Sequence, residues 1–394
     1  MDFDLPADVR AFEAELETFL QENQSPDVMD PNPEQLSQTV ETPPKRALMR
    51  KLAERGWLGM SWPKEYGGRE LSGLYDFVLT ETLSRYGAPQ PGKGVGIVGK
   101  TIIRHGSDTL KREFLPQIIR GEVEFAIGYS EPQAGSDAAN MQLKAVHDDA
   151  RGGWVLNGQK VWTTSAHFAD WYWVGARTNP DARKHKGISL LLIPMDHPGL
   201  TIRPTWTIGD ERTNEVFFDD VFVPDAYVVG QVDQGWTYIC EALDLERFAM
   251  MPVGPLEKKV EALVEHVRSA QRDGRPLRED RGVRARIARL ATDLEVSRML
   301  QRRVISEALG DGIPTTSSSQ YKLSMNETGQ RVADAALDLM GAEGQLRPDE
   351  EGAPIAGRFE RSYRYTVVDT IGGGASEIQK NNIARRGLGL PPSY

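Results

Sequence analysis

The sequence predicts a mainly α-helical protein with a β-strand domain in its middle. Apolar residues recur at helical spacing over much of the first third of the chain and again from about residue 235 onward. Between residues 122 and 234, short runs rich in β-branched and aromatic residues alternate with turn residues at intervals of roughly ten, which is typical of a small barrel or sandwich. We therefore expect three domains, at residues 1–121, 122–234 and 235–394.

Each domain is built from segments that the residue pattern defines individually. Proline near the start and glycine just past the end mark one of the first helices, at Pro43 and Gly56. The N-terminal segments expected to be helical are 4–23, 43–56, 72–86 and 108–120. The expected strands are 125–130, 141–149, 153–165, 170–178, 187–195, 200–206 and 214–224. In the last domain, the expected helices are 237–263, 283–309, 319–339 and, after a glycine-rich loop, 375–387.

Composition excludes several classes of protein. The single cysteine, Cys240, excludes an internal disulfide framework and is typical of a reducing compartment. A net charge of −10 argues against nucleic acid as a partner, and the six scattered histidines lack metal-site spacing. No apolar run approaches the ~18–20 residues of a membrane span. The acidic start has no apolar signal region. We expect a cytoplasmic protein without a structural metal.

The stretch 125–173 holds the features that point to a ligand. A small-residue turn occupies 134–137, and Trp162 stands beside the hydroxyls of Thr163 and Thr164. Backbone N–H groups on a tight turn attract anions, and an aromatic face stacks on a ring. These features suit a flat heteroaromatic ring that carries a phosphate tail. We interpret the stretch as a flavin-binding site.

A second motif matches a phosphate-binding loop. Residues 94–101 read GVGIVGKT, which fits both G-x-x-x-x-G-K-T and G-x-G-x-x-G. Both motifs require a strand before them, whereas the preceding SRYGAPQPGK is broken by proline and glycine. We favour a loop that leads into a helix from about Val98, and keep a phosphate-loop nucleotidase as a remote alternative.

Five motifs in order identify a family. WLGMSWPKEYGG, GYSEPQAGSD, NGQKVWTTSAHFADW, NEVFFDDVFVP and SEIQKNNIARRGLGLP cover most of the chain from about residue 50. With these motifs in this order, the chain resembles acyl-CoA dehydrogenases. The resemblance implies an α-helical N-terminal domain, a central β-barrel and a C-terminal four-helix bundle. It also implies FAD as cofactor and removal of an α-proton and a β-hydride from an acyl thioester.

The resemblance assigns the cofactor residues one by one. Ser130 resembles the residue whose hydroxyl binds the flavin ring, and Ser136 resembles the serine beside the pyrophosphate. Trp162 resembles the tryptophan that packs on the isoalloxazine, and Thr164 resembles the threonine near flavin N5. The further positions implied are Tyr129, Arg272, Gly341, Gly344 and Gln379. The chain departs from the family pattern where it lacks a phenylalanine near Arg272 and where it has Asp338, Ala342 and Ala375.

The general base is the most informative departure. Many members carry a glutamate at the position of Gly373, and here that side chain is missing. Isovaleryl-CoA dehydrogenase has its glutamate on a helix at the position of Glu246. We predict that Glu246 is the base, that Arg247 is its charge partner, and that Gly373 still offers its N–H to the thioester carbonyl.

The resemblance also suggests substrate and partners. Loss of a side chain at 373 leaves room for a branched or bulky acyl group, such as a sterol side chain, on an acyl-CoA. Electron-transfer flavoprotein is the expected acceptor, because the chain has no second redox centre. The expected assembly is a homotetramer or homodimer, or one half of an α2β2 heterotetramer. An acyl-CoA oxidase, a flavin monooxygenase and a non-catalytic partner subunit stay open.

Overall fold

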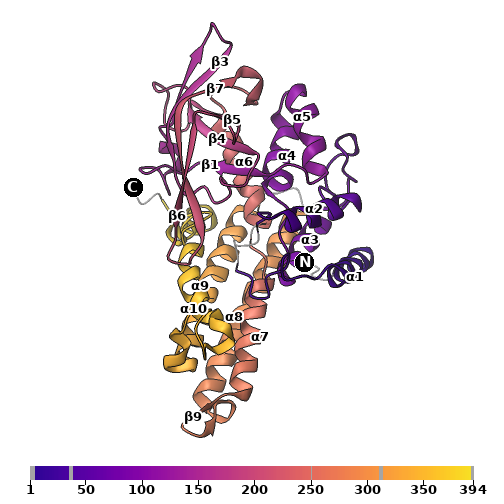
Figure 1. The fold of residues 1–394 in the computed structure, drawn as a ribbon, viewed down its shortest axis with the longest axis vertical. Helices are drawn as coiled ribbons and strands as arrows, with labels where there is room; N and C mark the ends of the chain where they lie inside the picture. Colours follow the sequence, from indigo (N-terminus) through magenta and orange to yellow (C-terminus); the bar gives the residue numbers. More distant parts are fainter. Residues whose placement is uncertain (1–4, 35–38, 250, 310–313, 392–394) are drawn as a thin grey trace.

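The computed structural model describes residues 5–34, 39–249, 251–309 and 314–391, and for residues 243–249 it describes the helix without its side chains. The described chain forms N-terminal helices, a twisted sheet and a long bundle of helices, with the sheet above the bundle (Figure 1). The end of the chain returns to the region between sheet and bundle (Figure 1). This order of helices, strands and helices confirms the predicted class.

The N-terminal part consists of short amphipathic helices, of which the first three share one apolar core while the last two pack against the sheet. Ser72 and Ser107 cap two of them by accepting hydrogen bonds from the backbone N–H groups of Leu74 and Leu110, at 3.3 Å each. Their bounds agree closely with the predicted segments. The helices are α1 (Ala7–Glu22), α2 (Pro43–Glu54), α3 (Gly73–Arg85), α4 (Gly99–His105) and α5 (Asp108–Ile119).

The GVGIVGKT motif is helical throughout. A π-helical turn at Gly94–Val98 runs directly into α4, and no strand precedes it in the described residues 86–93. A Cβ added to Gly99 would lie 2.2 Å from the Trp62 ring, so this glycine permits close packing. Lys100 Nζ lies 3.9 Å from Asp76 Oδ2. The phosphate-loop interpretation is therefore wrong, because the strand–loop–helix geometry that cradles phosphates is not there.

The middle part is one eight-stranded sheet. Its strands follow the order β6-β7-β3-β2-β4-β5-β8, and β1 joins the edge of β4 in parallel. One face packs against α4, α5 and α6, and the other encloses its own apolar cluster around Tyr172, Leu191 and Val216. The strands are β1 (Phe125–Gly128), β2 (Lys144–Asp148), β3 (Gly153–Lys160), β4 (Trp171–Arg177), β5 (Ile188–Pro194), β6 (Leu200–Trp206), β7 (Arg212–Pro224) and β8 (Val228–Val229).

The expected closed barrel is wrong. The terminal strands β6 and β8 do not pair among the described residues, so the sheet stays open. The spacing of strands and turns is the same for open and closed sheets, and closure depends on pairing of the end strands. Here β8 has only two residues. The neighbouring edge of β5 is covered by α6 instead, with a bridge between Ile188 and Gln234 at its start.

The C-terminal part is a bundle of long helices. Four of them, α7 to α10, share one apolar core that includes Leu263, Leu294, Val332 and Phe359. The bounds are α6 (Gly235–Ala249), α7 (Gly254–Ser269), α8 (Arg281–Ala308), α9 (Thr315–Met340), α10 (Arg358–Asp369) and α11 (Ser376–Asn382). A small hairpin, β9 (Gln271–Arg272) and β10 (Arg275–Pro276), lies at the far end of the bundle (Figure 1).

Two features of the bundle differ from the sequence-based expectation. The segment 237–263 is two helices, because Pro252 and Pro255 lie at the junction and Glu81 accepts hydrogen bonds from Val253 N and Gly254 N at 3.1 and 2.7 Å. Helix α10 was not predicted. Its polar residues Arg358, Ser362 and Asp369 are buried, which hides the usual apolar periodicity. None of the described helices is both long and apolar enough to cross a membrane.

Candidate active site

The turn after β1 is fixed by a buried carboxylate. Glu131 is 3% exposed and accepts hydrogen bonds from Lys160 Nζ at 2.7 Å, Gln142 N at 2.6 Å and Leu143 N at 2.9 Å. Burial lowers the pKa of Lys160 to about 8, and the charge of Glu131 opposes this shift. The ammonium therefore stays largely protonated at neutral pH. This ion pair holds the loop on which Ser136 is exposed.

Trp162 adopts a strained conformation at the end of β3. Its φ is +60° and its side chain is 60% exposed, although a large aromatic residue rarely takes a left-handed backbone. The next residue locks the loop, because Thr163 N donates to Asn214 O at 3.0 Å and Asn214 Nδ2 donates to Thr163 O at 2.8 Å. Thr164 follows as an exposed residue. Strain of this kind, maintained around an exposed indole, indicates a binding site.

The ends of β1 and β3 meet, which brings the predicted flavin residues together. Val161 N donates to Ser130 O at 3.0 Å, so Ser130 and Trp162 lie at adjacent positions of neighbouring chain segments. Tyr129 is oriented by its hydroxyl, which accepts a hydrogen bond from Trp173 Nε1 at 2.8 Å. Tyr129, Ser130 and Trp162 therefore lie close together, with Thr164 two residues beyond Trp162.

The loop between α10 and α11 is shaped by two glycines. Gly373 and Gly374 have φ of +65° and +98°, which favours glycine at both positions. Gln379 Nε2 donates to Gly374 O at 3.0 Å and so fixes the loop to α11. Gln379 Oε1 and Ser376 Oγ are buried without a hydrogen-bond partner. These two atoms are available to a polar ligand.

Lys322 lies directly beneath this loop and was not anticipated. A Cβ added to Gly373 would lie 3.4 Å from Lys322 Cε, and Lys322 Nζ donates to Asp369 O at 3.1 Å. Burial raises the pKa of Asp369 to about 7, while nearby Lys259 and Lys322 lower it and Glu34 raises it. A lysine within α9 gives no motif in the sequence, and only the packing of α10 on α9 brings it to the site.

The predicted base and its partner lie in the last turns of α6. Glu246 and Arg247 are helical, and their side chains lie outside what the structure describes. α6 contacts the π-helical turn, β5 and α9.

Three other predicted cofactor residues lie at the opposite end of α9. Arg272 Nη2 donates to Asp338 O at 3.0 Å and to Leu339 O at 2.9 Å, directly before Gly341 and Gly344. Gly341 has φ +67° and open space around an added Cβ, whereas Gly344 packs on Met340. Eighteen residues of α9 separate Lys322 from Met340, about 27 Å at ~1.5 Å per residue. Gln379, on α11 beside the first half of α9, thus lies far from Arg272, Gly341 and Gly344 at the other end of this helix.

Comparison with known proteins identifies the family. Residues 6–122, 126–221 and 233–388 match the N-terminal, middle and C-terminal domains of acyl-CoA dehydrogenases. Acyl-CoA dehydrogenase FadE26 of Mycobacterium tuberculosis is 34% identical over 355 residues, 88% of each chain. Mitochondrial isovaleryl-CoA dehydrogenase of Solanum tuberosum is 31% identical over 384 residues, 95% of this chain and 89% of that protein. The chain belongs to the acyl-CoA dehydrogenase family, a family of oxidoreductases.

Solved structures agree over the full length. A protein described as the Tcur3481-Tcur3483 steroid ACAD has a TM-score of 0.89 and 34% identity, with 100% of both chains covered. The ChsE4-ChsE5 complex from Mycobacterium tuberculosis has a TM-score of 0.88 and 31% identity, also with 100% of both chains covered. The family assignment made from five sequence motifs is confirmed.

Proposed function

We propose that the protein is an FAD-dependent acyl-CoA dehydrogenase that desaturates the Cα–Cβ bond of a bulky acyl-CoA, such as a thioester of a sterol side chain. The observation that carries this proposal is the full-length similarity, at a TM-score of 0.89, to a structure described as a steroid ACAD. The glycine at 373 supports it, because among the side chains that the structure describes only Lys322 Cε lies within 4 Å of an added Cβ there.

The residues around Trp162 fit a flavin. The exposed indole offers a flat face, Ser130 and Thr164 offer hydroxyls close to it along the chain segments that meet there, and the exposed Ser136 offers a third on the turn after β1. The buried, unpartnered Gln379 Oε1 and Ser376 Oγ would be satisfied by a polar ring or its ribityl chain. When bound, the flavin supplies the acceptor for the hydride that leaves Cβ.

The chain's own task is to take the α-proton. We assign this step to Glu246, with Arg247 as the charge that balances its carboxylate. The left-handed Gly373 would present its N–H to the thioester oxygen, which would stabilise the negative charge that develops when the α-proton leaves. In many relatives one loop supplies both the base and the N–H group that binds the thioester oxygen. Here the base would lie on α6 and the N–H group on the loop at Gly373.

The two groups of cofactor residues support a shared site. One chain places Gln379 near one end of α9 and Arg272, Gly341 and Gly344 near the other. We propose that the second group serves a flavin held mainly by another subunit. The partner is a second copy in a homodimer or homotetramer, or a related chain in an α2β2 heterotetramer, and two similar structures are described with two named components. Electron-transfer flavoprotein is the proposed electron acceptor.

Anaerobic bleaching of the flavin band by straight, branched and steroidal acyl-CoAs tests this function. We expect bleaching by bulky thioesters, slow reoxidation in air and fast reoxidation by electron-transfer flavoprotein. Glu246→Gln should keep the yellow cofactor and lose turnover by about 10²-fold or more, with Glu241→Gln on the same helix as control. Full activity of Glu246→Gln would refute the base, and reoxidation in air at the rate of turnover would identify an oxidase.

A further inference from the structure

The buried face of α10 is polar. Arg358, Ser362, Thr366 and Asp369 follow one another at spacings of four, four and three residues, and each is at most 6% exposed. Across from this face, α9 contributes Lys322 and Asn326, which both donate to the Asp369 carbonyl, at 3.1 and 2.5 Å. A helix that packs inside a bundle normally turns an apolar stripe inward. Apolar packing therefore does not explain why these polar residues are buried.

Within the described part of the chain, several buried polar atoms where α10 meets α9 have no hydrogen-bond partner. They are Asp369 Oδ1, Ser362 Oγ, the Nε and Nη2 atoms of Arg358 and, on α9, Asn326 Oδ1. Leaving a buried donor or acceptor unpaired costs about 1–3 kcal/mol, so native proteins usually satisfy such atoms with ordered water. Ordered water between the two helices would satisfy these atoms.

Buried charges connect the two ends of this polar face. Lys259 Nζ lies 2.5 Å from Glu34 Oε2, and both side chains are almost fully buried. Asp369 interacts electrostatically with Lys259, Glu34 and Lys322, and Arg358 interacts with Glu34. Glu211, Arg361, Asp30 and Glu261 are further charged groups of this cluster. The cluster is continuous from Lys322 to Arg358.

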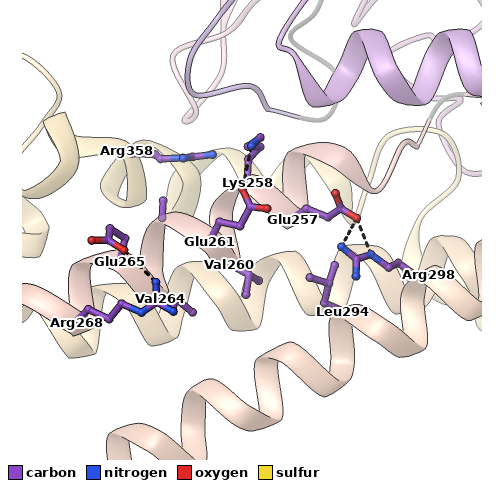
Figure 2. Close-up of a pocket in the computed structure, with 11 residues that line it drawn as sticks. Glu257, Lys258, Val260, Glu261, Val264, Glu265, Arg268, Leu294, Arg298 and Arg358 are labelled. Carbon is purple, nitrogen blue, oxygen red and sulfur yellow. Dashed lines mark hydrogen bonds and ion pairs between the residues drawn. The ribbon is translucent and has the colours of Figure 1, made fainter. Parts of the chain in front are cut away.

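Each end of the cluster reaches a different environment. At one end, Lys322 lies under Gly373, at the candidate active site. At the other end, Arg358 borders a groove of about 550 Å³ between α7 and α8, with Lys258, Glu261 and Arg298 among its lining residues. Figure 2 shows Arg358 beside Lys258 and Glu261 at the edge of this groove. The polar cluster thus extends from the candidate active site toward this groove.

We propose that the polar face of α10 is a proton route, with Asp369 as its relay, by which the α-proton leaves the active site for the groove. The inference rests on the proposed function. A proton passes from the protonated base through water to the Asp369 carboxylate. Asp369 then releases a proton through water past Glu34 and Lys259 to the groove. Only O–H bonds are exchanged, and no electrons move along this route.

The protonation behaviour of Asp369 suits a relay. Its pKa, raised to about 7 by burial, lets the carboxyl both accept and return a proton near neutral pH. Glu211, whose pKa burial also raises to about 7, lies in the same cluster and would exchange protons with it.

Washout of α-deuterium from a substrate analogue tests the route separately from the base. In the anaerobic holoenzyme, the deuteron reaches solvent only after it leaves the base, whereas flavin bleaching needs only its abstraction. We expect Asp369→Asn to slow washout by at least about tenfold and to change bleaching by less than about twofold. Glu360→Gln, on the face of the same helix opposite Asp369, where Glu360 pairs with Arg364 instead, is the control and should change neither rate.

A second variant and a second measurement keep the test decisive if Asp369→Asn does not fold. Glu34→Gln combined with Lys259→Met removes both charges of the buried pair and should also slow washout. In the protein without flavin, the infrared band of a protonated carboxyl near neutral pH should be lost in Asp369→Asn and kept in Glu360→Gln. Unchanged washout in both variants with intact bleaching overturns the inference. Failure of the wild type to bleach with any thioester overturns the proposed function, and the inference with it.

Discussion

The sheet and the C-terminal bundle bury charge in different ways. In the sheet, Glu131 accepts hydrogen bonds from Lys160 and two backbone N–H groups. In the bundle, Asp369 is just as deeply buried, but its Oδ1 has no protein partner. A buried carboxylate whose hydrogen bonds are all made is held rigidly. A buried carboxyl group with an unpaired oxygen is less constrained and can exchange a proton with water. The first suits a cofactor cradle, and the second suits proton transfer.

Lys160→Met breaks the rigid pair and should have the largest effect. It leaves the Glu131 carboxylate buried without its counter-charge, which should lower the free energy of unfolding by about 3–5 kcal/mol. Urea unfolding measures this loss. Lys144→Met, at an exposed position of β2, is the control and should change stability little. A loss below about 1 kcal/mol would show that Glu131 is held by its backbone donors alone.

Asp369→Asn should change how stability depends on pH. The pKa of Asp369 is about 7 in the folded protein, above its ordinary 3.8, so its contribution is complete below pH 3.8 and is lost as pH rises through 7. Relative to the variant, the wild type should lose up to about 1.4 kcal/mol per pH unit across this window. Urea unfolding at several pH values measures the difference, and parallel curves for both proteins would contradict the shift.

Arg358→Met replaces a buried charged side chain of the bundle by methionine, as Lys160→Met does in the sheet. Arg358 is buried, and its Nε and Nη2 atoms have no hydrogen-bond partner, so an apolar side chain of similar length should leave the free energy of unfolding within about 1 kcal/mol or raise it. Thermal and urea unfolding measure it alongside Lys160→Met. Equal losses in the two variants would remove the contrast between sheet and bundle.

Substitution of His147 should have the smallest effect on stability. Hydrogen bonds to Asp225 and Asp149 raise its pKa, so it stabilises the folded sheet below pH 6.5 and loses this contribution as pH rises through the raised value. His147→Gln should flatten the dependence of Tm on pH in this range by a small amount, because the pair is exposed to solvent. Calorimetry at several pH values checks this, and an unchanged profile would show that the contacts are not kept in solution.

The sequence predicted what local pattern encodes. Helix and strand positions followed from periodicity, and the turn and aromatic residues of 125–173 pointed to one ligand site, which the meeting of Ser130 and Val161 supports. The prediction of a closed barrel was wrong, because closure depends on the pairing of strands that are distant in the sequence. Lys322 and Asp369 went unnoticed because neither carries a motif and only the docking of α10 on α9 brings them together. The left-handed backbone of Trp162 also has no signal in the residue pattern.

The length of α9 has a genetic consequence. This helix keeps Gln379 well apart from Arg272 and Gly341, so under the proposed assembly each flavin draws on two chains. A chain that carries Trp162→Ala and a chain that carries Arg272→Ala would each fail alone. Produced in one cell, the two chains would form mixed oligomers in which some sites receive only intact halves. Restored activity in such a mixture is intragenic complementation.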